Sequence, residues 1–547
     1  MTRLGAPATL AAAACSLAAA ATAWFVRAES SPPSFDEAWY LEVSFKLFHA
    51  LRGRGPLAFA REYAQAFRFK APLAAVLPLP AYFAFGPSYA AAVLTNLPAL
   101  ALLSLSLYGL GRRLSSPTAG GLAAVFGLML PLTAALSRTF YVETWLTALT
   151  AAFLWRLSES DQLRRPREAP FLGVLLGLGL LSKVLFPGVI AGPVALTLWE
   201  RRRDPRGPDW PAIERPLKVL LGLAATVALT WYGPNLIYVV GFAYSAYRGD
   251  IGAHYGSGGA WDPARVAGYY RMIGHDVLSY YVVLLFAGLC LLLGRRGWEA
   301  PGLRLAAAWA APYLLLTTSG LAKEQRYLDC VLPAAALALA VLLDGTTAGK
   351  PGRPLRLGLA VAPLAYLFAL QTFGSSLIPA PPAVLSGMFP ERTTYGGPPR
   401  NSPAWDLERL PGRLAGVIGS RAVIVVGCEH GRLNANLLAA WAARGSLPLS
   451  FINYGHMEEH VERAVARLSE KDATHILFID GLDPRELPQM VPRVDAALRR
   501  LIDTGRLPFR LVRRFDLAPG SDLSAELWER TAPIRMTGDP GDPGVID

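Results

Sequence analysis

The sequence contains a series of apolar segments, each close in length to the roughly 20 residues with which an α-helix crosses a membrane. Of its 547 residues, 53% are hydrophobic and only 17% are charged, whereas about 25% of the residues of a soluble domain are charged. This composition excludes an ordinary soluble protein and predicts a polytopic α-helical membrane protein. We expect about eleven spans, at 9–27, 88–110, 117–136, 140–157, 170–186, 187–199, 217–238, 276–294, 303–319, 327–343 and 355–373.

The positive charges between these segments predict how the chain is threaded through the membrane. Short loops with Arg112-Arg113, Arg201-Arg202-Arg203 and Arg295-Arg296 share one side if the run 71–86, which contains three prolines, does not span. Short basic loops remain in the cytoplasm, so we expect that run to be interfacial or re-entrant. A cleaved signal peptide is the alternative for the first segment. We expect an uncleaved span, with the N-terminus inside and the C-terminus outside.

The membrane domain is predicted to cover residues 1–373, with two long outer loops at 28–70 and 239–275. A linker rich in Pro, Gly and Ser follows at 374–411. Beyond it, short buried strands alternate with helical stretches, which predicts an extracytoplasmic α/β domain with a mostly parallel sheet over 412–547. The expected strands are 422–427, 449–453, 475–480 and 509–515, and the expected helices are 432–444, 457–469 and 485–504.

Positive charge is concentrated in the membrane domain. The formal net charge is +12, but the segment 412–547 carries −1 and the rest carries +13. A nucleic-acid-binding protein needs a basic face on a soluble domain, and the sequence does not indicate one. The expected location is the cytoplasmic (inner) membrane, with the lipid bilayer as surroundings.

Several ionisable side chains are predicted at the outer ends of the spans, and such residues are functional by default because they are costly at membrane depth. Glu143 begins a span five residues after Arg138, and an interfacial pair between the two is the alternative to a functional role. Lys183 would meet an anionic lipid head group or, alternatively, extend to the interface. Lys323 and Arg326 suit the same anion, since Lys and Arg recognise phosphate.

An acidic pair, Asp36-Glu37, lies in the first outer loop and is followed by Trp39 and Tyr40. Such a carboxylate can act as general base for an acceptor hydroxyl. The alternative is a solvated pair of loop charges.

In the C-terminal domain, the segment Gly427–Gly431 follows a strand and is expected to open a helix, a position that suits an anion. It lacks the GxGxxG and Walker patterns, and a packing or partner domain is the alternative.

The order of these motifs resembles that of the GT-C glycosyltransferases of the protein O-mannosyltransferase and aminoarabinose transferase type (family 39 and its bacterial relatives). The resemblance covers about residues 1–373. It rests on Asp36-Glu37, Lys70-Ala71-Pro72-Leu73, Leu107–Leu114, Arg138…Glu143, Gly179–Lys183…Pro187 and Arg326-Tyr327-Leu328…Pro333. The sequence departs from the family where Lys-Ala-Pro-Leu replaces Lys-Pro-Pro-Leu and where Asp329-Cys330 replaces apolar residues.

The resemblance implies a GT-C fold and an enzyme that transfers a sugar, with inversion, from a polyprenyl-phosphate donor to an acceptor hydroxyl on the outer face. It implies that Asp36 is the base, with Glu37 beside it, and that Glu143 is a second acid. The expected contacts to the donor phosphate are Lys183, Lys323, Arg326, Tyr327 and Arg138. No cofactor is expected to be required, and a divalent cation is not indicated, because Lys and Arg can neutralise a monophosphate leaving group.

Two other classes of function compete with the enzyme. A transporter or flippase of lipid-linked sugars would place its charged residues near the middle of the membrane, in internal repeats. The charges here gather at one predicted interface, and the sequence shows no repeat of fixed period. A scaffold whose outer domain recruits partners would leave Glu143 and Lys183 without a purpose. We therefore expect the enzyme.

Overall fold

The computed structural model of the chain describes residues 5–204, 210–248, 259–294, 299–400, 405–455, 458–488, 490–518 and 520–534. The chain divides into two compact units: Met1–Glu29 with Gly55–Arg400, and Ser30–Arg54 with Asn401–Asp547. This division differs from the sequence-based one in that 374–400 stays with the helical unit and 30–54 folds with the C-terminal region. Arg295, Arg296 and the middle of the predicted loop 239–275 lie outside the described residues.

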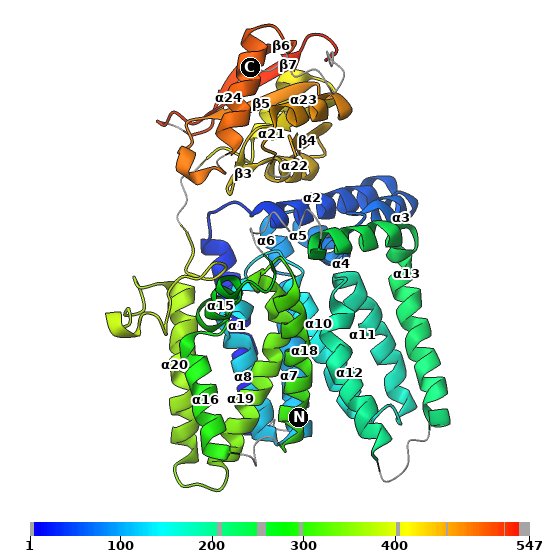
Figure 1. Cartoon of the computed structure of the whole chain (residues 1–547), viewed down its shortest axis with the longest axis vertical. Coiled ribbons are helices and arrows are strands. Elements are labelled where there is room, and N and C mark those ends of the chain that lie inside the picture. The colour runs from blue at the N-terminus through cyan, green and yellow to red at the C-terminus, as the bar shows by residue number, and fades with distance from the viewer. Residues whose placement is uncertain are drawn as a thin grey trace. The chain divides into compact units, whose positions relative to one another are not determined.

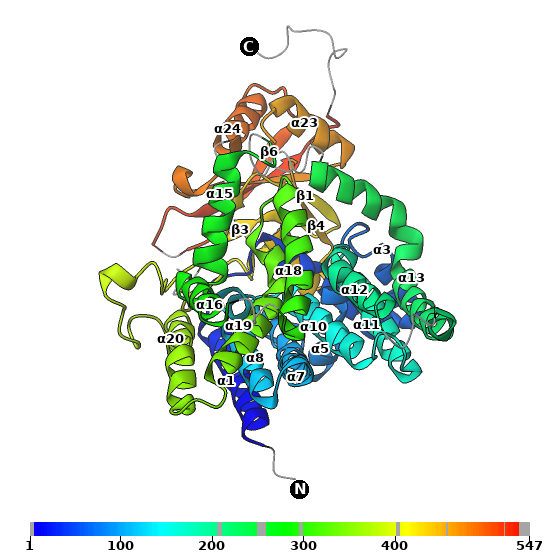
Figure 2. The ribbon, with the colours of Figure 1, turned by 60° about the horizontal axis from the view of Figure 1, so that its bottom comes forward.

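The first unit is helical, and its long helices run side by side (Figures 1 and 2). A helix occurs at each predicted span. These helices are α1 (Ala6–Ala28), α7 (Asn96–Leu114), α8 (Pro117–Met129), α10 (Glu143–Glu159), α11 (Ala169–Ser182), α12 (Phe186–Arg202), α13 (Trp210–Arg248), α16 (Tyr280–Leu293), α18 (Pro301–Ser319), α19 (Leu332–Thr347) and α20 (Arg353–Phe373).

Not all of these helices have the length and apolarity of a membrane span. Among the described residues, four helical segments do: Ala6–Ala28, Tyr89–Leu114, Gln325–Thr347 and Arg353–Phe373. A fifth is added if Pro263–Val277 and Tyr280–Leu293, which meet at 97°, count as one broken span. The predicted number of eleven is not reached by this measure, because α8 and α11, for example, have only 13 and 14 residues.

Short helices connect the long ones. Within the run 71–86, prolines separate α4 (Leu73–Val76) from α5 (Leu79–Phe85), because proline lacks a backbone donor and clashes with the preceding turn. The other short elements of this unit are α3 (Pro56–Gln65), α6 (Tyr89–Val93), α9 (Pro131–Leu136), η2 (Pro166–Glu168), α15 (Pro263–Met272), η3 (Ile273–Val277), η4 (Gln325–Val331) and η5 (Ala383–Leu385).

The second unit contains a five-stranded sheet in the order β4-β1-β5-β7-β6. Its strands are β1 (Ala422–Val426), β4 (Leu449–Asn453), β5 (His475–Asp480), β6 (Phe509–Asp516) and β7 (Ser524–Arg530). The four predicted strands are present, but β7 was not predicted. It inserts antiparallel between β5 and β6, so only the two pairings of β1 are parallel and the expectation of a mostly parallel sheet is wrong.

Helices cover both faces of this sheet. The chain passes from β1 through α22 (Ala435–Arg444) to β4, and then back past β1 through α23 (Val461–Glu470) to β5. Since such crossovers are right-handed, the two opposite directions place α22 and α23 on opposite faces. The core beneath α23 and α24 (Met490–Asp503) contains Val425, Ile476 and Phe478. The remaining helices are α21 (Leu410–Ile418), η6 (Pro484–Glu486), and α2 (Phe35–His49) with η1 (Ala50–Arg54).

Candidate active site

The centre of the candidate site is Glu143, the first residue of α10. Its side chain is 3% exposed. Oε1 accepts a hydrogen bond of 2.7 Å from Nζ of Lys183 and lies 3.9 Å from Nε of Arg326. Oε2 is buried and has no hydrogen-bond partner among the described residues. Two cations therefore converge on one carboxylate whose second oxygen is still available to a polar group.

Local backbone geometry brings Lys183 to this point. Lys183 is the residue that directly follows α11, and its extended backbone (φ −158°, ψ 139°) turns the chain out of the helix. The turn can be tight because Gly179 lies against the ring of Phe186, where a Cβ atom would come within 2.4 Å of the ring. The ammonium group is 4.1 Å from the centroid of the Tyr327 ring, a distance at which a cation is attracted to the aromatic face.

Arg326 and Tyr327 lie in the 3₁₀ segment η4. The guanidinium group of Arg326 is 4.9 Å from the ring centroid of Tyr141, a residue that the sequence analysis did not single out. The segment is anchored by Asp329, which is fully buried. Its two carboxylate oxygens accept hydrogen bonds of 2.7 Å from the hydroxyls of Thr133 and Thr147.

Asp329 therefore ties η4 to α10 one helical turn after Glu143. It was noted in the sequence only as a departure from the family. The signal that could have marked it as a positioning residue is the presence of a carboxylate inside an apolar run.

The structure separates Lys323 from this cluster. Nζ of Lys323 donates to the carbonyls of Thr318 and Gly320, at 2.5 and 3.3 Å. It borders a cavity of about 230 Å³ that Arg265 and Tyr269 also line. Burial, and then the charge of Arg265, lower the pKa of Lys323. Glu324 lines the same cavity, so two basic side chains and one acidic side chain border it.

Arg138 is buried, and its hydrogen bonds join α20. It donates to the carbonyl of Gln371 at 3.2 Å and to the hydroxyl of Thr372. Its guanidinium group also lies over the rings of Phe25 and Phe368, at 5.4 and 5.3 Å. These contacts indicate a packing function, and the alternative of an Arg138–Glu143 pair is replaced by the pairs of Glu143 with Lys183 and Arg326.

Asp36 and Glu37 lie at the start of α2, in the second unit. They differ in environment. Glu37 is 5% exposed, and its Oε2 accepts hydrogen bonds from the backbone N–H and the hydroxyl of Ser34, at 3.0 and 2.8 Å. This is the reach-back half of a capping box, so Glu37 stabilises the beginning of the helix. Asp36 is half-buried and precedes it.

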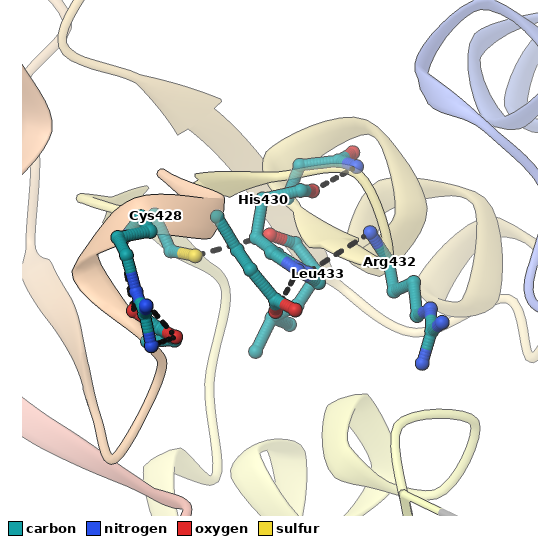
Figure 3. Close-up of polar contacts among 8 residues, drawn as sticks. Cys428, His430, Arg432 and Leu433 are labelled. Carbon is teal, nitrogen blue, oxygen red and sulfur yellow. Dashed lines mark hydrogen bonds and ion pairs between the residues drawn. The ribbon is translucent and has the colours of Figure 1, made fainter. Parts of the chain in front are cut away.

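The sequence predicted that the loop after β1 opens a helix directly, and this prediction is wrong. It forms a small hairpin of β2 (Glu429–His430) and β3 (Leu433–Asn434), and Oδ1 of Asn434 caps α22 by accepting from the N–H of Leu437. The sulfur of Cys428 points to the carbonyl of Leu433 (Figure 3). The hairpin therefore takes the place of the helix N-terminus on which the predicted anion site depended.

The imidazole of His430 is held by both nitrogens. Nδ1 accepts from the backbone N–H of Arg432 (Figure 3), and Nε2 therefore carries the proton that it donates to Glu486, each at 3.1 Å. Because neither nitrogen is left to activate the Cys428 thiol, this cluster stabilises the hairpin. Among the described residues, no group of three or more His, Cys, Asp or Glu side chains is placed to hold a metal ion.

The fold is that of GT-C glycosyltransferases. ArnT from Cupriavidus metallidurans in the apo state aligns with 93% of this chain and 96% of its own, at 12% identity and a TM-score of 0.54. ArnT bound to undecaprenyl phosphate aligns with 95% and 97%, at 14% identity and a TM-score of 0.55. The mycobacterial arabinofuranosyltransferase AftD matches 94% of this chain but 41% of its own length, at 15% identity and a TM-score of 0.51.

Sequence comparison points the same way for part of the chain. Residues 71–238 match the model of the family described as dolichyl-phosphate-mannose-protein mannosyltransferase. No curated protein matches the sequence. The resemblance that the order of the motifs predicted is confirmed: this is a multi-pass membrane protein that resembles ArnT and has the GT-C fold.

Proposed function

We propose that this protein is an inverting glycosyltransferase that moves a sugar from a polyprenyl-phosphate donor to an acceptor hydroxyl. The observation that carries the proposal is the convergence of Lys183 and Arg326 on the buried carboxylate of Glu143 within a GT-C fold. The side chains of the two cations are 17% and 14% exposed. They are thus protected from bulk water without being closed off from a ligand.

The donor chemistry requires positive charge at the leaving group. As the bond between the sugar C1 and the phosphate oxygen breaks, its electron pair remains on the polyprenyl phosphate. Cations placed beforehand stabilise such developing charge. Lys183 and Arg326 supply it in this proposal, with the aromatic faces of Tyr327 and Tyr141 behind them, and a divalent cation is not needed for the step.

The acceptor chemistry requires a base. The acceptor oxygen forms the new bond to C1 from the opposite side, and its proton passes to a carboxylate, which we assign to Asp36. Glu37 then supports its neighbour by capping α2. Glu143 orients Lys183, and its Oε2, which has no hydrogen-bond partner in the described part of the chain, is suited to bind a hydroxyl of the sugar.

The cavity beside Lys323 gives the donor a further contact in the proposal. Lys323 and Arg265 contribute two positive charges to its lining and Glu324 contributes one negative charge, so the positive charge that remains would attract an anion. Arg138 is left out of the donor site because its hydrogen bonds are to α20.

We further propose that the reaction takes place on the outer face of the cytoplasmic membrane, with about eleven spans and an extracytoplasmic C-terminal domain. The arginine-rich short loops support this orientation. The relatives that bind polyprenyl phosphate, such as ArnT with undecaprenyl phosphate, support a lipid-linked donor.

The experiment that tests the function is mass spectrometry of polyprenyl-phosphate sugars that co-purify with the protein, followed by a transfer assay with the lipid that is found. We expect release of free polyprenyl phosphate that depends on an acceptor. A protein that moves the same lipid across liposomes, without release of polyprenyl phosphate under any acceptor, would instead be a transporter.

A further inference from the structure

The helix that carries Asp36 folds with the C-terminal sheet. α2 packs along α22 within the second unit (Figure 1). The amide of Asn436 donates to the carbonyl of Phe35, at 3.2 Å. At the other end, Nε2 of His49 donates to the carbonyl of Arg444, at 3.0 Å. Because first residues pair with each other and last residues pair with each other, the two helices run parallel and are tied at both ends.

The buried residues of α2 define one side of the helix. At 100° per residue, the buried residues of α2 occupy about half of the helix circumference; they are Glu37, Ala38, Tyr40, Leu41, Ser44, Phe45, Leu47 and Phe48. Asp36 falls at the edge of that half and is half-buried. A rotation of the helix by a single residue would bury Asp36 or turn it fully into solvent. The rotational setting of α2 therefore controls how a carboxylate at this position meets a substrate.

The two residues next to Asp36 in the sequence are both held. The carbonyl of Phe35 accepts from Asn436, and the carboxylate of Glu37 accepts from Ser34. The backbone of Asp36 is thus fixed from one side by the C-terminal domain and from the other by the helix cap. The pairs of Glu143 with Lys183 and Arg326, in contrast, lie within the first unit.

We propose that the C-terminal domain is the positioning module for the acceptor half of the reaction, with Asn436 as the residue that holds the Asp36 helix in its setting. We expect the donor half to keep its affinity when this helix is displaced, because the pairs of Lys183 and Arg326 with Glu143 lie within the first unit. This inference rests on the proposed function, in which Asp36 is the base, and it gives the C-terminal domain a defined task.

The test uses the full-length protein with two readouts, hydrogen exchange of the α2 amides by mass spectrometry and transfer kinetics beside undecaprenyl phosphate binding. We expect Asn436→Ala to accelerate exchange over 35–49 by about 3- to 10-fold, the effect of one lost hydrogen bond. Transfer should fall roughly 10-fold or more, since small displacements of a reacting group are costly. Undecaprenyl phosphate affinity should not change.

Matched variants separate positioning from general damage. His49→Gln keeps an amide donor for the Arg444 carbonyl and should resemble the wild type, whereas His49→Ala should resemble Asn436→Ala. Arg463→Ala, at an exposed position of α23, is the control from the same domain and should change neither readout. A fall in donor affinity that parallels the fall in transfer would indicate structural damage and overturn the proposal.

The remaining outcomes distinguish this inference from the proposed function. Unchanged exchange over 35–49 in Asn436→Ala/His49→Ala would overturn the inference. So would normal transfer by that double variant when Asp36→Asn is inactive. Full transfer by Asp36→Asn would contradict the assignment of Asp36 itself and, with it, the proposed mechanism.

Discussion

The ammonium group of Lys183 lies 2.7 Å from Oε1 of Glu143, although 40 residues separate them in the sequence. Lys183 directly follows α11 and Glu143 begins α10, so the pair joins two helix ends within the helical unit. A buried pair of this kind is costly to break, because the remaining charge loses its partner. The same pair offers a cation to an anionic ligand that can compete with Glu143.

Replacement of this cation should weaken donor binding. A charge-assisted hydrogen bond contributes roughly 1.5–3 kcal/mol, so Lys183→Ala should lower the affinity for undecaprenyl phosphate by about 10- to 100-fold. Lys218→Ala is the matched control, since Lys218 is an exposed lysine paired with Glu214 on α13. Equal affinity of both variants in folded protein would return Lys183 to the alternative of a lysine that extends to the membrane interface.

The two acids of α2 should behave differently. Asp36→Asn keeps the shape of the side chain but removes the basic oxygen, so transfer should fall by about 10²- to 10⁴-fold while undecaprenyl phosphate binding persists. Glu37→Gln should cost about 1 kcal/mol in stability, as expected for a weakened helix cap, with a smaller effect on transfer. Glu42→Gln, on the same helix and paired with Lys46, controls for loss of charge. A larger loss of transfer in Glu37→Gln than in Asp36→Asn would reverse the two assignments.

Asp495 should make the second unit less stable as the pH rises. Burial raises the pKa of its carboxyl group to about 7, while Tyr454 and Arg499 oppose the shift and Asp480 adds to it. The ordinary value is 3.8, so between these two pH values the folded state binds more protons than the unfolded state. Stability therefore falls as the pH rises from about 4 to about 7 and is then constant for this group.

The buried thiol of Cys428 can report this change, because it reacts only when the second unit opens. In the Asp495→Asn variant the side chain carries no charge at either pH, so its contribution to stability does not change with pH. The ratio of the Cys428 labelling rate in the wild type to that in the variant should be at least roughly 10-fold higher at pH 8 than at pH 5. A ratio that does not change between the two pH values would disprove the link.

Gly427 should not tolerate a side chain. A Cβ atom there would lie 2.2 Å from Oδ1 of Asp495, so Gly427→Ala should destabilise the second unit by about 1–3 kcal/mol and accelerate labelling of Cys428. Gly431→Ala is the control in the same loop, where a Cβ atom meets nothing within 4 Å. Combining Gly427→Ala with Asp495→Ala should recover most of the loss, as a double-mutant cycle would show.

The orientation of the chain can be tested at Ser521, which is exposed in the second unit. If the C-terminal domain is outside, Ser521→Cys should react with an impermeant thiol reagent in intact cells. The wild type, which retains its four native cysteines, gives the background. Labelling only after lysis would place the domain in the cytoplasm and contradict the proposed sidedness.

Much of the architecture could be predicted because it follows from local properties. The apolar segments predicted a helix at each expected span, and the apolar runs beginning at Ala422, Leu449, His475 and Phe509 predicted four of the five strands of the main sheet. β7 was missed because its sequence, Ser524–Arg530, carries two glutamates and an arginine. It becomes a strand by pairing with neighbours on both sides, and hydropathy does not register such pairing.

The sequence by itself determined that this chain is a helical membrane protein with a small α/β region, and it marked Glu143, Lys183 and Arg326 as unusual, because an ionisable group in an apolar run is costly wherever the run folds. Only the tertiary structure decided how these groups pair. It joined Glu143 to Lys183 rather than to Arg138, gave Lys323 a separate cavity, and folded the Asp36 helix with the C-terminal sheet. The free-energy cost of burying an ionisable group depends on the residue and on its own segment. Which groups pair depends on which helix ends meet, and residues far apart in the sequence determine that.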